Sequence, residues 1–291
     1  MVTYIKNEKD SRFCLVNKRE RNGTIEYFCT FDAARAKKEG IFRLIRRLPR
    51  ISNKEILNGF NSAEIDSEKA IVYHGNRIPI TVNLDVNLNE IAHYLGCYLA
   101  DGTKKGFNWG ICASNFEQAN YYKKMHDQLI NNPKVTFSIT YTDPENKEKE
   151  DLEEYLIRTW ENNTCIKLSK IKVRIIPTAY KNAANRNMHG TLIFKENREL
   201  TRIYYVRLLT SLLNKIEKEN NKELALDFIC GVMEGDGCVN ARKRGHIIIT
   251  SNLKELKILE KVVKITGLSY KLHMEAKNKG YIRIWALELI N

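Results

Sequence analysis

Two stretches of the chain, YLGCYLADG at Tyr94–Gly102 and ICGVMEGDG at Ile229–Gly237, repeat one pattern. Each copy is an apolar helical segment with small residues one turn apart, Gly96 and Ala100 in the first and Gly231 and Gly235 in the second. Small residues at this spacing allow two helices to approach backbone to backbone. The repeat therefore predicts that the two helices pack together and bring their terminal residues, Asp101 and Asp236, side by side.

The similarity between the two copies continues beyond the motif. Gly102 and Gly237 are predicted to take the left-handed conformation that ends a helix. A basic hairpin, a strand (Phe107–Ala113 or His246–Thr250) and a capped helix follow each of them. Further strand-like segments lie at Thr136–Thr142, Cys165–Ile176, Ser269–Ala276 and Tyr281–Leu287, and a long helix at Arg198–Glu219 closes the first half. The fold class predicted is α+β, with two pseudo-symmetric α-β-β-α-β-β halves over residues 88–220 and 221–291.

Residues 1–87 carry no copy of the repeat and are predicted to form a small basic accessory segment of α+β type. Two strands, Phe13–Val16 and Thr24–Thr30, are joined at Asn22-Gly23, which is a strong hairpin signal. Phe31–Lys38 and Ile51–Asn61 have the pattern of short helices. Two roles stay open for this segment, a structural cap and an additional DNA-contacting module.

The composition favours a polyanionic partner. The chain has 48 Lys and Arg against 35 Asp and Glu, a formal net charge of +13. Each Lys or Arg placed on a phosphate releases a condensed counterion, so such a balance supports nucleic-acid binding. No apolar run approaches the roughly 20 residues of a membrane span, and the first residues lack a secretory signal. We expect a cytoplasmic protein, or one in the compartment that holds its target DNA, with no membrane partner.

The two Asp residues indicate a metal centre. Carboxylates held close together repel each other, and both Asp101 and Asp236 would lie at the negative end of a helix dipole. A divalent cation with a preference for hard oxygen ligands, Mg²⁺ with Mn²⁺ as a substitute, relieves this repulsion. One or more such ions can activate water and stabilise the leaving oxygen of a phosphodiester.

The hairpins after the two motifs are predicted to contact DNA. A twisted antiparallel ribbon fits the major groove, where base edges present a distinguishable pattern of donors and acceptors. A solvated charged loop is the usual alternative for such a run, but here the run occurs twice, each time after Asp-Gly. The predicted DNA contacts are Lys104, Lys105, Asn108, Trp109, Asn240, Arg242, Lys243, Arg244, His246, Lys271 and Arg283.

At these motifs the sequence resembles the LAGLIDADG homing endonucleases, and with two motifs in one chain it is similar to the single-chain, monomeric subgroup. The resemblance implies two antiparallel sheets that form a saddle over double-stranded DNA with a long, specific target, in the setting of intron or intein mobility. It implies that Asp101 and Asp236 bind Mg²⁺ and are catalytic, with Ala100 and Gly235 in the same metal site. Family members often place a basic residue near each centre, for which Lys195 is the catalytic candidate here, with Lys271 or Lys277 in the second half.

Two other functions stay open at this stage. The chain could be a non-cleaving binder built on the same fold, either a maturase that binds intron RNA or a DNA-binding regulator. A pure binder has no need for two apposed carboxylates, which favours the endonuclease. The chain could also be a basic structural protein in which the repeat is only a packing device.

Overall fold

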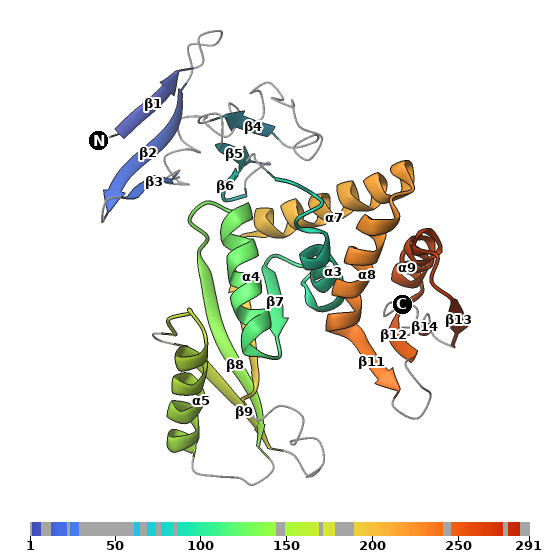
Figure 1. Cartoon of the computed structure of the whole chain (residues 1–291). Helices are drawn as coiled ribbons and strands as arrows, with labels where there is room; N and C mark the ends of the chain where they lie inside the picture. The colour runs from blue at the N-terminus through green and yellow to red at the C-terminus, as the bar shows by residue number, and fades with distance from the viewer. Residues whose placement is uncertain are drawn as a thin grey trace.

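The computed structural model describes residues 2–6, 13–21, 24–28, 61–64, 69–73, 77–83, 86–143, 149–168, 171–177, 189–240, 246–275 and 279–285. Within these residues the chain is mixed α+β, with mostly antiparallel sheets placed around a central pair of helices (Figure 1). None of the helices in the described ranges is both long enough and apolar enough to cross a bilayer.

The first elements are two small antiparallel sheets, β1 (Val2–Lys6), β2 (Phe13–Arg21) and β3 (Thr24–Phe28), then β4 (Asn61–Glu64), β5 (Lys69–Tyr73) and β6 (Ile80–Asn83). Arg21 of β2 pairs with Thr24 of β3 next to the turn, so two residues connect the strands, as the hairpin signal predicts. The predicted helices Phe31–Lys38 and Ile51–Asn61 lie outside the described residues, apart from Asn61 itself, which begins β4.

The sheet that contains β5 and β6 packs on the first half of the chain. Val72 and Val82 are fully buried in the same core as the helices that follow, and Val82 forms a bridge with Ile130. The Arg77 guanidinium donates to the Glu199 carboxylate with an Nε–Oε2 distance of 2.6 Å. β5 and β6 thus share a core with the first half, while the predicted domain boundaries at 87/88 and 220/221 stay predictions.

The first half contains α3 (Ala92–Asp101), β7 (Trp109–Ala113), α4 (Phe116–Leu129), β8 (Val135–Asp143), α5 (Lys149–Asn163), β9 (Lys172–Pro177), β10 (Thr191–Glu196) and α7 (Glu199–Glu219). Its sheet has the order β7-β10-β8-β9, in which β8 and β9 are parallel. This order departs from the predicted one, because a single described strand separates α3 from α4 and α5 lies between β8 and β9. Parallel neighbours need a crossover connection, and α5 supplies it.

The second half contains α8 (Lys222–Asp236), β11 (Gly237–Asn240), β12 (His246–Asn252), α9 (Leu253–Thr266), β13 (Tyr270–Met274) and β14 (Lys279–Trp285). Its sheet is antiparallel throughout and has the order β11-β12-β14-β13. This is the α-β-β-α-β-β order that the repeat predicts. Because the first half differs from it, the predicted symmetry does not hold element by element.

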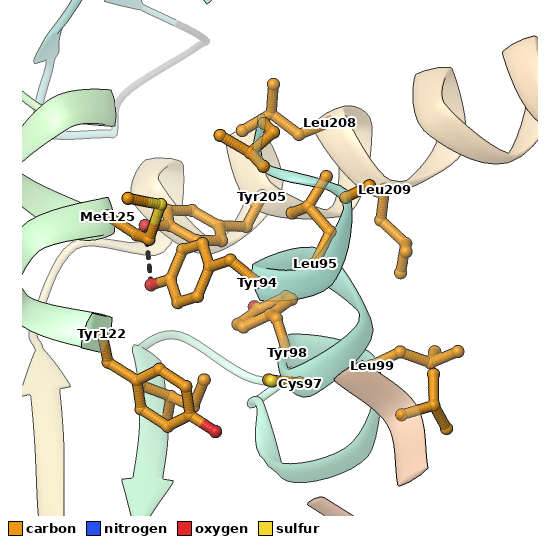
Figure 2. Packing of buried hydrophobic residues seen from close by; sticks show 14 of the residues in the cluster. Tyr94, Leu95, Cys97, Tyr98, Leu99, Tyr122, Met125, Tyr205, Leu208 and Leu209 are labelled. Atoms are coloured by element: carbon orange, nitrogen blue, oxygen red, sulfur yellow. Dashed lines mark hydrogen bonds between the residues drawn. The ribbon is translucent and has the colours of Figure 1, made fainter. Parts of the chain in front are cut away.

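The core between α3, α4 and α7 is unusually aromatic. Tyr94, Tyr98 and Tyr205 are fully buried, and the Tyr94 and Tyr205 hydroxyls are hydrogen bonded at 3.1 Å (Figure 2). Their rings pack at tilted or edge-to-face angles, which is the arrangement that aromatic pairs prefer. This cluster packs on one face of α3, and the opposite face of α3 contacts α8.

Candidate metal centre

The two motif helices, α3 and α8, pack backbone to backbone, as the small residues predict, and lie side by side at the centre of the molecule (Figure 1). A Cβ atom placed on Gly96 would lie 2.1 Å from the Phe228 carbonyl oxygen. One placed on Gly231 would lie 2.0 Å from the His93 carbonyl oxygen. No residue with a side chain fits at either crossing point, so the repeated glycines set the distance between the helices.

This packing brings the last residues of α3 and α8, Asp101 and Asp236, to one place. Asp101 lies against Gly235, where an added Cβ would approach the Asp101 Oδ2 atom to 2.7 Å. The residues before the two aspartates also meet, since the same Cβ would be 2.5 Å from that of Ala100. Asp101, Asp236, Ala100 and Gly235, the four predicted metal-site residues, therefore come from neighbouring ends of two helices.

The glycines that follow the aspartates do not take the predicted left-handed conformation. Gly102 has φ −84° and ψ 153°, and Gly237 has φ −74° and ψ 128°, so both are extended. Lack of space explains the glycine instead. A Cβ on Gly102 would meet the Tyr98 ring at 2.2 Å, and one on Gly237 would meet the Met233 carbonyl oxygen at 2.1 Å. The chain thus turns sharply out of each helix without a side chain at the turn.

The electrostatics of the pair match the expectation for a cation site. Burial, and next the charge of Asp236, raise the pKa of the Asp101 carboxyl to about 6. Burial also raises the pKa of the Asp236 carboxyl above its usual value. Each carboxylate further faces the C-terminal, negative end of its own helix. Two carboxylates held this close are suited to a divalent cation such as Mg²⁺, which would favour the ionised form of both.

Lys104 lies at this centre, although the sequence pattern predicted it at the tip of a DNA-binding ribbon. Its ammonium donates to the Leu99 carbonyl oxygen at the end of α3 and lies 3.2 Å from the Glu255 Oε1 atom of α9. Its charge lowers the pKa of both Asp101 and Asp236. Lys104 is therefore a basic residue that the structure places beside both carboxylates.

Lys195, the predicted catalytic lysine, lies on a strand of the first sheet, and its catalytic role stays a prediction. It is exposed on β10, where it is paired with Gly110 of β7 and Thr136 of β8. The structure thus places Lys195 on the face of a sheet. Lys277 lies outside the described residues.

The loop after Asp101 is a short hairpin closed by a hydrogen bond from the Thr103 amide to the Gly110 carbonyl oxygen, 2.9 Å long. Lys105 is exposed and Asn108 is half-buried, so both remain available for DNA contact. Phe107 between them is 79% exposed, a residue that the sequence pattern did not single out.

The prediction that Trp109 contacts DNA is wrong. Its side chain is fully buried and stacks on His126 with the ring centroids 3.9 Å apart. Trp109 is the first residue of β7, and the alternation of that strand turns it towards the core. It belongs to the aromatic core and not to the surface ribbon.

Part of the second predicted ribbon is not described. Arg242, Lys243 and Arg244 lie outside the described residues, and only the backbone positions of Asn240 in β11 and His246 in β12 are given. On the same sheet, Lys271 of β13 is paired directly with Arg283 of β14. Lys271 is exposed and Arg283 half-buried, so the two cations share the outer face of the sheet.

Comparisons with known proteins give no family assignment. No protein-family model matches the chain, and no curated protein matches it. Among solved structures, the homing endonuclease I-DmoI in complex with DNA and Mn has a TM-score of 0.35 and 12% identity, covering 70% of this chain and 94% of its own. Mesophilic variants of I-DmoI give a TM-score of 0.38, 13% identity, and 70% and 93% coverage. At TM-scores this low, the likeness establishes neither a shared fold nor a function, and the family resemblance of the motifs stays a prediction.

The structure adds polar residues that pattern reasoning missed. Lys172 and Arg174 of β9 are exposed and are paired with Ser138 and Thr140 of β8. The register of the sheet places the side chains of Lys172 and Arg174 on the same face as that of Lys195. Strand alternation around the buried Ile139 is the signal that could have found this face, had the parallel position of β9 been known.

Proposed function

We propose that this chain is a divalent-metal-dependent endonuclease that hydrolyses double-stranded DNA at a long, specific site. The observation that carries the proposal is the meeting of Asp101 and Asp236 at the ends of two helices that glycines hold in backbone contact. Ordinary folding gains nothing from two partly buried carboxylates that repel each other. The arrangement is useful when a cation is bound between them.

Asp101 and Asp236 would hold the ion, Mg²⁺ or Mn²⁺, with the backbone at Ala100 and Gly235 closing the site from the helix side. A bound divalent cation supplies a more acidic water and neutralises charge on the leaving phosphodiester oxygen. Lys104 offsets the negative charge of the pair, and its contact with Glu255 fixes its ammonium beside both carboxylates. Lys104 thus favours the ionised form of both carboxylates and keeps a cationic side chain close to the incoming phosphate.

DNA binding is proposed for the outer faces of the two four-stranded sheets, which lie on either side of the α3–α8 pair (Figure 1). In the first sheet the face carries Lys195, Lys172 and Arg174, and in the second it carries Lys271 and Arg283. Cations on both sides of a central metal site would contact phosphates on both sides of a scissile bond. The net charge of +13 supports the same partner. A single chain supplies both aspartates, so we propose that it acts as a monomer.

The test is cleavage by matched variants that keep the shape of the carboxylates. Asp101→Asn and Asp236→Asn remove one ionisable oxygen each and should lower cleavage of a target duplex by at least about a thousandfold, while affinity for the duplex stays within severalfold. Glu223→Gln, an exposed position in the first turn of the helix that ends at Asp236, is the control and should cut normally. Full activity of both site variants would refute the assignment. Normal binding with no cleavage by the wild-type chain would identify a non-cleaving binder instead, and intron RNA would then be the ligand to test.

A further inference from the structure

A second group of potential metal ligands lies in the same helix pair, on the N-terminal side of the aspartates. His93 and Cys97 are one helical turn apart on α3, and Glu234 faces them from α8. One ligand atom from each of the three, an imidazole nitrogen, a thiol sulfur and a carboxylate oxygen, lies within 4.8 Å of the other two. Asp101 and Asp236 are not members of this group.

The imidazole of His93 is held from both sides. Its Nε2 atom lies 2.7 Å from the Glu234 Oε2 atom, and its Nδ1 atom lies 3.8 Å from the Asp227 Oδ1 atom. The other Asp227 oxygen accepts a hydrogen bond from the His93 backbone amide at 3.1 Å. In the metal-free chain the 2.7 Å contact needs a proton on Nε2. A cation bound between Nε2 and the Glu234 oxygen would replace that proton, and the Asp227 carboxylate behind the ring would then favour the remaining proton on Nδ1. Nε2 is the nitrogen that faces Glu234.

The thiol side of the group is buried and has a polar neighbour of its own. Cys97 is fully buried, and burial raises the pKa of its thiol to about 12. The Tyr122 hydroxyl is buried, lacks a hydrogen-bond partner among the N and O atoms of the described residues, and lies against this thiol. Figure 2 shows Tyr122 reaching from α4 towards the side of α3 that carries Cys97. A thiolate at this position would accept a hydrogen bond from the Tyr122 hydroxyl.

We propose that His93, Cys97 and Glu234 form a site for a borderline-soft transition metal ion of the zinc class, separate from the Asp101–Asp236 centre. One nitrogen, one sulfur and one oxygen ligand are the donors such ions take, whereas Mg²⁺ takes oxygen ligands. The side chains of His93 and Glu234 are 28% and 38% exposed, so an ion can enter from solvent and water can complete the coordination. Because the ligands come from two helices, the ion would clamp α3 to α8 just before the catalytic aspartates.

The test uses Co²⁺ alone as a spectroscopic probe on the full chain, reduced and freed of metal by a chelator. The expected result is one equivalent of bound Co²⁺ with a thiolate-to-cobalt charge-transfer absorption, displaced by one equivalent of Zn²⁺. Cys97→Ser should abolish the absorption. His93→Gln and Glu234→Gln should weaken Co²⁺ binding at least about tenfold, as should Asp227→Asn behind the imidazole. These last three positions are partly exposed, so they keep the test valid if Cys97→Ser fails to fold.

Two controls separate this site from other thiols and from the proposed catalytic centre. Cys230→Ser removes a partly buried thiol from α8 that is not in the group, and it should leave the absorption unchanged. The double variant Asp101→Asn/Asp236→Asn should also keep it, even though that variant no longer cuts DNA. Absence of the absorption in the folded wild-type chain would overturn the proposal. So would an absorption that persists at full strength in both His93→Gln and Glu234→Gln.

Discussion

The carboxylate of Asp101 packs against Gly235, so closely that a Cβ on Gly235 would lie 2.7 Å from the Asp101 Oδ2 atom. Gly235, the residue before Asp236, therefore limits where the Asp101 carboxylate can lie on the neighbouring helix. This relationship links the packing of α3 and α8 to the geometry of the proposed metal centre.

Gly235→Ala is predicted to disturb the centre more than the fold. The added methyl meets two side chains, those of Ala100 and Asp101, so Asp101 must turn away. We expect a fall in cleavage of about 100-fold, because small misplacements of catalytic groups cost that much, and a loss of about 1–3 kcal/mol in the free energy of unfolding. Steady-state cleavage and urea unfolding measure the two effects.

Gly231→Ala is the comparison for that variant. Its methyl would meet the His93 carbonyl oxygen at 2.0 Å, and a backbone atom cannot turn away as a side chain can. Its loss of unfolding free energy should therefore exceed that of Gly235→Ala. Equal stability of Gly231→Ala and the wild-type chain would show that the helices are not in backbone contact.

The raised pKa of Asp101 predicts a defined pH dependence of stability without metal. The folded-state pKa of about 6 lies above the usual 3.8, so the folded chain binds this proton more tightly than the unfolded chain does. The resulting stabilisation is complete below about pH 4 and is lost as the pH rises through about 6. At pH 7 the ionised carboxylate is the less stable form in the folded chain, so Asp101→Asn should remove that cost and raise the metal-free stability by roughly 1 kcal/mol, a value discounted for solvent screening.

Melting temperatures of the wild-type chain and of Asp101→Asn at pH 5 and pH 8, both in chelator, measure this difference. The gap between the two proteins should widen at pH 8. With Mg²⁺ present the order should reverse, because only the wild-type carboxylate gains from the cation. A gap that is the same at both pH values would mean that Asp101 titrates normally.

Lys104→Gln is predicted to move the acid limb of the cleavage profile to higher pH. The lysine charge lowers the pKa of both carboxyls, so its loss raises them, and protons then compete with the cation at higher pH. The cleavage rate measured from pH 5 to pH 9 at fixed Mg²⁺ reports the shift. Lys105→Gln alters the next, exposed residue and should weaken DNA binding without moving the limb. A shift of equal size in both variants would contradict the role given to Lys104.

Phe107 and Trp109 are predicted to affect different properties, although they are two residues apart. Phe107→Ala removes an exposed ring and should lower DNA affinity severalfold with stability unchanged. Trp109→Phe leaves a gap beside His126 and should cost about 1–3 kcal/mol of unfolding free energy with DNA affinity unchanged. Binding isotherms and urea unfolding of the two variants distinguish the roles, and reversed results would return Trp109 to the DNA interface.

The parts of this structure that follow from local chemistry could be read from the sequence. The end of α3 at Asp101 and of α8 at Asp236 follows from the small-residue repeat, and the long helix Glu199–Glu219 follows from its apolar period. Helix α5 carries the same kind of signal in Leu152, Leu156 and Trp160, which are buried at four-residue spacing, but the prediction missed it.

The remaining features depend on residues that meet only in the folded chain. Lys104 lies three residues after Asp101, yet its partner Glu255 belongs to the other half, so no local pattern indicates that it turns back. The burial of Trp109 depends on His126 of α4 in the same way. The parallel pairing of β9 with β8 depends on the helix between them and cannot be read from either strand.

The most direct test of the central claim is selection of bound duplexes from a random library in Ca²⁺, followed by exchange into Mg²⁺. If Asp101 and Asp236 form the metal centre of a site-specific endonuclease, one long sequence is enriched and is then cut on both strands a few bases apart. The Asp101→Asn chain should select the same sequence and leave it intact. Enrichment of a sequence that the wild-type chain never cuts in Mg²⁺ or Mn²⁺ would contradict the claim.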